Sequence, residues 1–315
     1  MFIKTTGHPA TRWAAAAITL SLWASAFVGI RVGLRDYDPF QLALFRYLVA
    51  SLCLLAVAGL RKIRFPEPRD LCRLALLGTV GIAGYNMALN YGERSVTAAS
   101  ASLIVNTAPL FTLIGSALFL KEKVRPLGWL GMLVSFAGVS LIACQGGPTL
   151  AFSGEILAIL CAAVFQSFYI VVQKPLLKKY HSLEVTTYAI WFGTLLPLPF
   201  IKPLFGSMMQ APAASSLAVI YLGVFPGAIA YFSWSFVLSK LPAAKAASFL
   251  FLIPPLTAII GLVWLREMPK IITGVGGLLA IGGVMLANQN GGRKRTKPAG
   301  VPGGGPGDNR EIVNP

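Results

Sequence analysis

Long apolar runs separated by short polar segments dominate the sequence from Trp13 to Asn288. Most runs are about 18–24 residues long, enough for an α-helix to cross the ~30 Å hydrocarbon core of a bilayer. The connecting segments are short, contain Pro or Gly, and leave no room for an inserted soluble domain. The pattern predicts an all-α integral membrane protein with ten transmembrane helices, at residues 13–34, 40–60, 71–91, 96–120, 127–144, 154–173, 184–201, 215–238, 244–265 and 271–288.

One stretch of the fourth predicted helix recurs in the ninth. Residues 106–122 read NTAPLFTLIGSALFLKE, and residues 251–267 read FLIPPLTAIIGLVWLRE. A shift of 145 positions places Pro109 on Pro254 and Glu122 on Glu267, and it continues to match residues outside this window without a gap. A period of this length indicates a duplicated half of the chain.

The duplication divides the chain into two predicted halves of five helices, residues 13–145 and 154–288. Residues 1–12 precede them, and a basic Gly/Pro-rich tail, residues 289–315, follows and is predicted to be disordered. Because five is odd, the second half enters the membrane from the opposite side. Such inverted-topology repeats surround the central cavity of many secondary transporters.

The first apolar run also resembles a secretory signal, because Ala24-Ser25-Ala26 has the form of a cleavage site. The run continues past that site to Leu34, and the repeat requires a helix here to match residues 154–173. We therefore expect the first helix to be retained.

Composition agrees with a membrane protein. The chain is 56% hydrophobic and 12% charged, with a mean hydropathy of +0.70, whereas soluble domains have about 25% charged residues. The net charge of +16 follows from topology: 20 of the 27 Lys and Arg residues fall on one side of the predicted helices, six on the other, and Arg46 lies inside a helix. The positive-inside rule then places both termini in the cytoplasm of a multi-pass protein of the cell membrane, and nucleic acid is not expected as a partner.

No catalytic or cofactor signature is present. The four Cys and two His are scattered without metal-ligand or redox spacing, so neither a metal site nor a cofactor is expected. The sequence has no Walker motif, no HExxH and no paired membrane aspartates. We therefore expect a protein that is not an enzyme and is not driven by ATP.

Polar residues inside the apolar runs are the candidate substrate contacts, because such groups are costly in hydrocarbon unless they face a cavity or a partner. Arg46 is the sharpest case: it would anchor a substrate carboxylate or a gate, or else snorkel to the outer headgroups or cap carbonyls of a neighbouring helix. The aromatic candidates have packing as their alternative. The expected cavity residues are Trp23, Arg46, Asn86, Asn106, Gln166, Tyr231 and Trp234.

The repeated stretch supplies candidate moving parts. Pro109 and Pro254 interrupt matching helices, and broken helices at matching positions point to a binding site, although a kink needed only for packing is the alternative. Glu122 and Glu267 end these helices and are predicted to be paired gate or interface elements, or ordinary surface ion pairs. The Gly-rich helices that follow, 127–144 and 271–288, allow close packing, either in a homodimer or within their own bundle.

These features together resemble the EamA family of the drug/metabolite transporter superfamily. The resemblance rests on Trp23 with Ala26-Phe27, on Phe45-Arg46, and on the Pro-containing helices that close on Leu-Lys-Glu (120–122) and Leu-Arg-Glu (265–267), and it covers residues 13–288. It implies a central cavity between inverted halves that moves amino acids, related metabolites or drugs by alternating access. We expect an exporter of small metabolites in the lipid bilayer; the alternatives are a flippase for lipid-linked intermediates and a non-transport receptor or scaffold.

Overall fold

The computed structural model describes residues 9–61, 63–96, 98–143, 153–265 and 271–288. The C-terminal tail, most of the N-terminal segment and Glu267 lie outside the described residues, as do the predictions made for them. Within the described ranges all regular structure is helical, which confirms the predicted all-α class.

The described residues of the first half of the chain form eight helical segments. They are α1 (Pro9–Gly33), α2 (Pro39–Arg61), α3 (Pro68–Gly78), the π-helical η1 (Thr79–Gly84), α4 (Tyr85–Gly92), α5 (Ala98–Val105), α6 (Ala108–Phe119) and α7 (Pro126–Ala143). Several begin with proline, whose fixed φ and missing N–H suit the first turn of a helix.

The second half follows the same plan. Its segments are α8 (Gly154–Lys179), α9 (Ser182–Leu195), the 3₁₀ turn η3 (Leu198–Phe200), α10 (Ile201–Gln210), α11 (Ala213–Leu222), the π-helical η4 (Gly223–Ala230), α12 (Tyr231–Lys240), α13 (Ala243–Ser248), the 3₁₀ turn η5 (Phe249–Leu252), α14 (Ile253–Leu265) and α15 (Ile271–Asn288). The helix predicted at 184–201 instead ends at Leu195, because Pro197 and Pro199 interrupt the backbone hydrogen bonds, and the chain resumes as α10.

Irregularities in the helices recur at the period of the repeat. Helix α6 begins at Ala108 and α14 at Ile253, and α7 begins at Pro126 and α15 at Ile271; both pairs are 145 positions apart. The π-helical segment η1 likewise corresponds to residues 224–229 of η4. These breaks therefore recur in both halves, whereas the break between α9 and α10 has no counterpart in the continuous helix α2.

Six described helical stretches are long and apolar enough to span a membrane: Ala10–Gly33, Pro39–Arg61, Pro68–Gly92, Gly154–Lys179, Ala213–Lys240 and Ala243–Ile260. A seventh is obtained if Ser182–Leu195 and Leu198–Gln210, which are bent by 57° at their junction, count as one span. Three shorter apolar helices accompany them, Ala108–Phe119, Pro126–Gly138 and Gly274–Ala287. The count of ten spans and their inverted orientation stay predictions.

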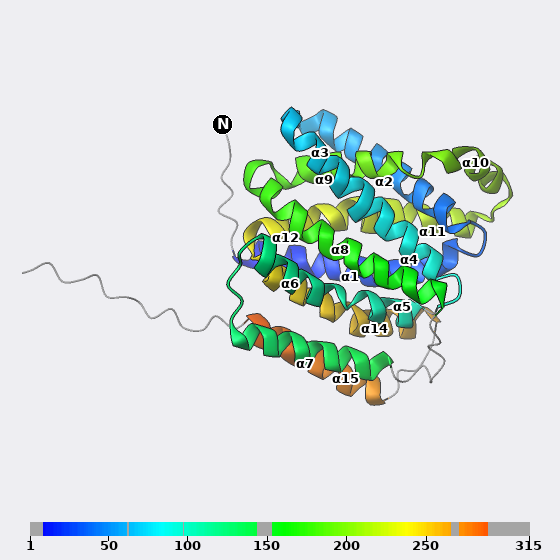
Figure 1. Ribbon diagram of the computed structural model, residues 1–315. Coiled ribbons are helices and arrows are strands. Elements are labelled where there is room, and N and C mark those ends of the chain that lie inside the picture. Colours follow the sequence, from blue (N-terminus) through cyan, green and yellow to red (C-terminus); the bar gives the residue numbers. More distant parts are fainter. Residues whose placement is uncertain (1–8, 62, 97, 144–152, 266–270, 289–315) are drawn as a thin grey trace, which may run out of the picture.

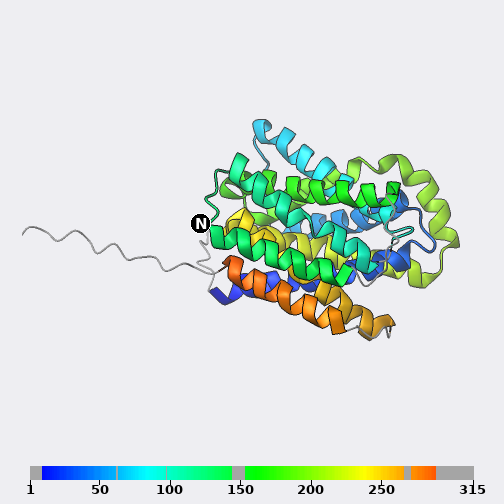
Figure 2. The ribbon, with the colours of Figure 1, turned by 60° about the horizontal axis from the view of Figure 1, so that its bottom comes forward.

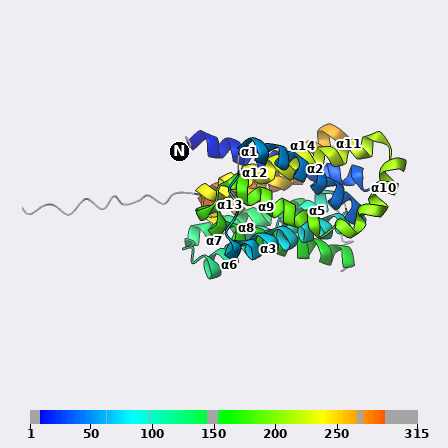
Figure 3. The same ribbon diagram turned by 90° about the horizontal axis from the view of Figure 1, so that it is seen from above.

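Most helices run along a common direction, and α10 lies at one end of the bundle (Figures 1 and 3). Helices α7 and α15 lie side by side along one face of the molecule, and the turned view in Figure 2 shows the same pairing from below. Close approach of their backbones requires glycine: a Cβ added at Gly131 would lie 2.6 Å from the Gly283 carbonyl oxygen. The Gly-rich helices thus pack on each other within one chain, and a homodimer through them stays a prediction.

Candidate functional site

A central cavity lies between helices of the two halves. Its polar lining includes Arg46 from α2, Asn106 from the break between α5 and α6, and Gln166 from α8. Aromatic and aliphatic side chains complete the wall, namely Trp23, Phe27, Ile30, Tyr85, Leu89, Val105, Tyr169, Ile170, Tyr231, Leu250 and Ile253. The breaks in α5–α6 and α13–α14 both contribute to this wall, so the irregular backbone borders the cavity.

Arg46 is held in place by a buried amide. Its side chain is 3% exposed, and its Nη1 donates to Asn86 Oδ1 at 2.8 Å. Asn86 Nδ2 in turn donates to the hydroxyl of Tyr47 and to the Ile82 carbonyl oxygen. Arg46 therefore neither snorkels outward nor caps a described helix; it is positioned beside the cavity by Asn86.

An aromatic cluster also borders the cavity. The ring of Trp23 lies 5.4 Å from the rings of Tyr231 and Trp234, and Tyr169 meets Tyr231 edge-on at 5.6 Å. Trp23 Nε1 donates to the carbonyl oxygen of Pro226, which lies in η4. The π-helical segment of the second half therefore orients a cavity residue of the first.

Two polar atoms beside the cavity have no hydrogen-bond partner among the described residues: Arg46 Nε, a donor, and Asn106 Oδ1, an acceptor. Asn106 is 2% exposed, and its Nδ2 donates to the Ser102 carbonyl oxygen at 2.6 Å, which fixes the orientation of the amide. Burying such groups unpaired costs roughly 1–3 kcal/mol each. A ligand that supplies one acceptor and one donor would recover this cost.

Five of the seven predicted cavity residues line the cavity: Trp23, Arg46, Asn106, Gln166 and Tyr231. The other two stand directly behind it, Asn86 as the partner of Arg46 and Trp234 as the partner of Trp23. Tyr85 and Tyr169 also line it and were not among the predicted residues. Tyr169 was detectable, because it follows Gln166 by three positions and so shares its helix face.

The cavity is small in this conformation. The volume that water centres can reach is about 30 Å³, which corresponds to roughly two water molecules. An amino acid does not fit in this volume without movement of the wall.

Glu122 links the two halves at one end of the bundle. Its carboxylate accepts hydrogen bonds from the backbone N–H groups of Ala243, at 2.8 Å, and Ala244, at 3.2 Å, the first residues of α13. Lys174 of α8 donates to the Leu238 and Leu241 carbonyl oxygens where α12 ends. A carboxylate thus caps the start of α13 while an ammonium caps the end of α12.

The predicted kink residues lie in the first turns of the helices that follow the breaks. Pro109 is the second residue of α6, after the break at residues 106–107, and Pro254 is the second residue of α14, after η5. Both are buried. Their role as moving parts stays a prediction, and so does any gating role of Glu122.

Comparison with known proteins assigns the family. The EamA-like transporter family matches the chain twice, at residues 11–144 and 153–289. The chain belongs to the EamA-like transporter family. It is thus a multi-pass membrane transporter built from two copies of the family's repeat, as the resemblance of its sequence motifs indicated.

Similar proteins support this assignment. An uncharacterized transporter, YdfC, of Bacillus subtilis is 42% identical over 269 residues, covering 85% of this chain and 88% of that protein. A probable terminal-alkyne amino-acid exporter of Streptantibioticus cattleyicolor is 39% identical over 275 residues, covering 87% and 92%. A solved crystal structure that is 20% identical covers 89% of this chain and 97% of its own, with a TM-score of 0.72, and so shares the fold.

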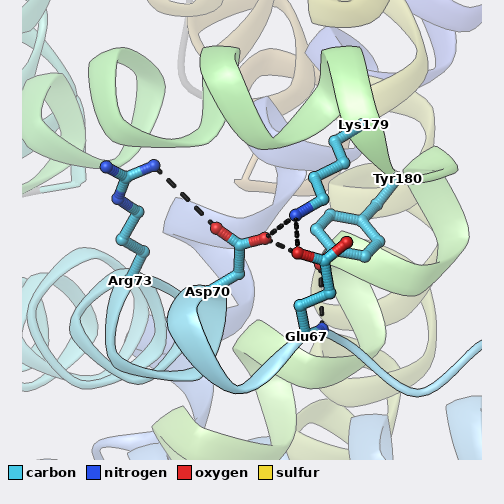
Figure 4. A network of polar contacts seen from close by, with 5 residues as sticks. All are labelled: Glu67, Asp70, Arg73, Lys179 and Tyr180. Carbon is cyan, nitrogen blue, oxygen red and sulfur yellow. Dashed lines mark hydrogen bonds and ion pairs between the residues drawn. The ribbon is translucent and has the colours of Figure 1, made fainter.

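A polar network joins the two repeats of this EamA-like transporter near the start of α3 (Figure 4). Asp70 accepts hydrogen bonds from Lys179 Nζ at 2.6 Å and from the Tyr180 hydroxyl at 2.7 Å. Lys179 also pairs with Glu67 at 2.5 Å, and Arg73 lies 3.9 Å from Asp70 on the other side. The network ties α3 of the first repeat to the end of α8 of the second, and sequence analysis missed it because its members are 109–113 positions apart.

Proposed function

We propose that this EamA-like transporter is a secondary transporter that exports amino acids or related small metabolites across the cytoplasmic membrane by alternating access. The proposal rests on one observation: a single apolar and aromatic cavity contains an unsatisfied donor, Arg46 Nε, and an unsatisfied acceptor, Asn106 Oδ1. The 39% identical relative is a probable terminal-alkyne amino-acid exporter, which agrees with this substrate class.

The polar groups match the two ends of a zwitterion. A guanidinium binds a carboxylate strongly, through charge-assisted hydrogen bonds. An amide oxygen accepts from an ammonium group, and the aromatic rings of Trp23 and Tyr231 line the same cavity, where a cation could interact with them. Because the described residues that line the cavity include no Asp or Glu, a substrate with a second positive charge would lack a partner among them. The remaining wall suits an apolar side chain.

Transport requires the cavity to open. We place the ten spans in two inverted five-helix halves, residues 13–145 and 154–288, with both termini in the cytoplasm, as the distribution of Lys and Arg favours. The breaks before Pro109 and Pro254 and the π-helical segments η1 and η4 border the cavity wall or support it, and they are the elements we expect to move.

The test is counterflow in proteoliposomes loaded with one of a panel of unlabelled amino acids, with uptake of the labelled compound measured. Wild-type protein should exchange apolar amino acids faster than basic ones. Arg46→Ala should abolish exchange, and Asn106→Ala should raise KM more than it lowers the maximal rate. Arg94→Ala, an exposed arginine at the end of α4, is the matched control and should retain activity. Normal exchange by both cavity variants would contradict the assigned site.

The same proteoliposomes test proton coupling. Equal initial rates of transport with and without a pH gradient would exclude it.

A further inference from the structure

The side chain of Glu93 is a carboxyl group buried at the end of α4. It follows Gly92, the last residue of that helix, and is 0% exposed. Both of its oxygens lack a hydrogen-bond partner among the described residues. An ionised carboxylate is costly to bury without partners, because it loses the water that solvates its charge. Glu93 therefore carries a proton in the conformation that the structure describes.

Two arginines from neighbouring helices act on this carboxyl group. Arg31 of α1 donates from Nη1 to the backbone carbonyl oxygen of Glu93 at 3.3 Å, which places its guanidinium group beside the carboxyl. Burial raises the pKa of Glu93 well above its ordinary value, against the positive charges of Arg31 and of Arg46 from α2, which favour the ionised form. If the burial were relieved, both arginines would stabilise the carboxylate.

The other titratable groups around Glu93 have contacts of their own. The start of α8 packs against Gly92, and its Glu155 is engaged in hydrogen bonds there. The guanidinium group of Arg94 lies over the ring of Tyr91. Protonation of Glu93 is therefore governed by its burial and by the two arginines.

The surroundings of Glu93 adjoin the wall of the central cavity. Leu89 lines the cavity, lies on the same face of α4 as Glu93, and accepts the backbone hydrogen bond from Glu93 at 2.9 Å. Ile30 also lines the cavity and directly precedes Arg31. Because an amino acid enters only if the wall moves, displacement of Leu89 or Ile30 would loosen the packing that buries Glu93.

We propose that Glu93 is a proton-binding site of the transport cycle, which holds one proton while it is buried and releases it to water when substrate widens the cavity. This inference rests on the proposed function. One proton leaves the carboxyl for each amino acid that binds at Arg46 and Asn106, and one returns when the empty cavity closes. Substrate and proton then weaken each other's binding by the same factor, as the exchange of an exported amino acid for an entering proton requires.

The first test needs no substrate. Infrared spectra of the purified full chain at about pH 7 should contain the carbonyl stretch of a protonated carboxylic acid, and Glu93→Gln should lack that band. Glu155→Gln is the matched control and should keep it, because Glu155 is a carboxyl group at the same end of the bundle with hydrogen bonds that favour its ionised form. An unchanged spectrum in Glu93→Gln would overturn the proposal.

The second test is calorimetric titration with leucine, in two buffers of different ionisation enthalpy. At about pH 7 wild type should release close to one proton per bound leucine. Its Kd should fall about tenfold per pH unit above a pH of about 5, until the buried carboxyl ionises. Glu93→Gln should release no proton, and its Kd should not vary with pH. Glu93→Asp, which keeps a carboxyl group, should retain the release, and Glu155→Gln should behave as wild type.

The possible failures of the second test are distinct. Leucine binding without proton release, or with proton uptake, would overturn the proposed role of Glu93 and leave the proposed transport function intact. Proton release that persists in Glu93→Gln would assign it to another group and would overturn the role too. If wild type binds neither leucine nor any other amino acid of the counterflow panel, the proposed function is contradicted, and the coupling proposal fails with it.

Discussion

Glu122→Ala is expected to destabilise the contact between the two repeats. The half-buried carboxylate caps α13 through two hydrogen bonds from the N–H groups of Ala243 and Ala244. Loss of a helix N-terminal cap costs about 0.5–2 kcal/mol, and hydrogen bonds to a charged group are worth about 1.5–3 kcal/mol when buried. We therefore expect a loss of about 2 kcal/mol in the free energy of unfolding, with Glu122→Gln losing about half as much because its one remaining oxygen can still accept.

The assay is thermal unfolding of the purified protein in a single detergent. A loss of about 2 kcal/mol lowers the midpoint by roughly 4–8 °C for a chain of a few hundred residues. Glu67→Ala is the control, because Glu67 forms an exposed ion pair with Lys179, and such pairs contribute about 0–1 kcal/mol. A Glu122→Ala midpoint no lower than that of Glu67→Ala would refute the capping role, and the carboxylate would then be an ordinary surface charge.

Three further predictions use the same assay. Gly283→Ala should lower the midpoint, because the added Cβ would lie 2.5 Å from a backbone oxygen of α7, whereas Gly282→Ala, with nothing within 4 Å, should not. Lys121→Gly should raise it, because φ is 53° at Lys121 and this region costs an L-residue about 1–2 kcal/mol. Glu93 is fully buried just beyond the span that ends at Gly92, and burial raises its pKa well above the ordinary value. Above a pH of about 5, the folded protein therefore keeps a proton that the unfolded chain has lost. The free energy of unfolding should then fall as the pH rises, by up to about 1.4 kcal/mol per pH unit, until the folded carboxyl ionises. Glu93→Gln should flatten this slope.

The sequence was sufficient to predict the all-α class and five residues of the cavity wall, because both depend on local patterns. Apolar runs of membrane length are set by the bilayer, and polar residues within them, such as Arg46 and Asn106, must face a partner or a cavity. The break before Pro109 recurs before Pro254 because the duplicated sequence carries proline at both places. The interruption at Pro197 was missed, because the apolar pattern continues through it.

The partners of these residues could not be predicted, because they are set by packing between distant segments. Asn86 shares a helix face with Asn90, and nothing in this spacing indicates that Asn86 holds Arg46, 40 positions away. Asn90 instead donates to the carbonyl oxygen of Pro39. Two amides on one face of one helix therefore have different tasks, one supporting the cavity and the other anchoring the start of α2.

The stretch that recurs at residues 106–122 and 251–267 is a further case in which the sequence did not reveal the partner of a side chain. Its sequence was compatible with a paired gate or interface element and with ordinary surface ion pairs, and it did not indicate what the carboxylate contacts. In the structure, Glu122 from the end of α6 caps α13, the segment that leads through η5 to Leu250 and Ile253 in the cavity wall. Neither composition nor periodicity identifies the contact of such an acidic residue. Here the carboxylate fixes the start of a broken helix whose next turn borders the proposed substrate site. Removing it should therefore affect transport as well as stability, whereas a surface charge pair would affect neither.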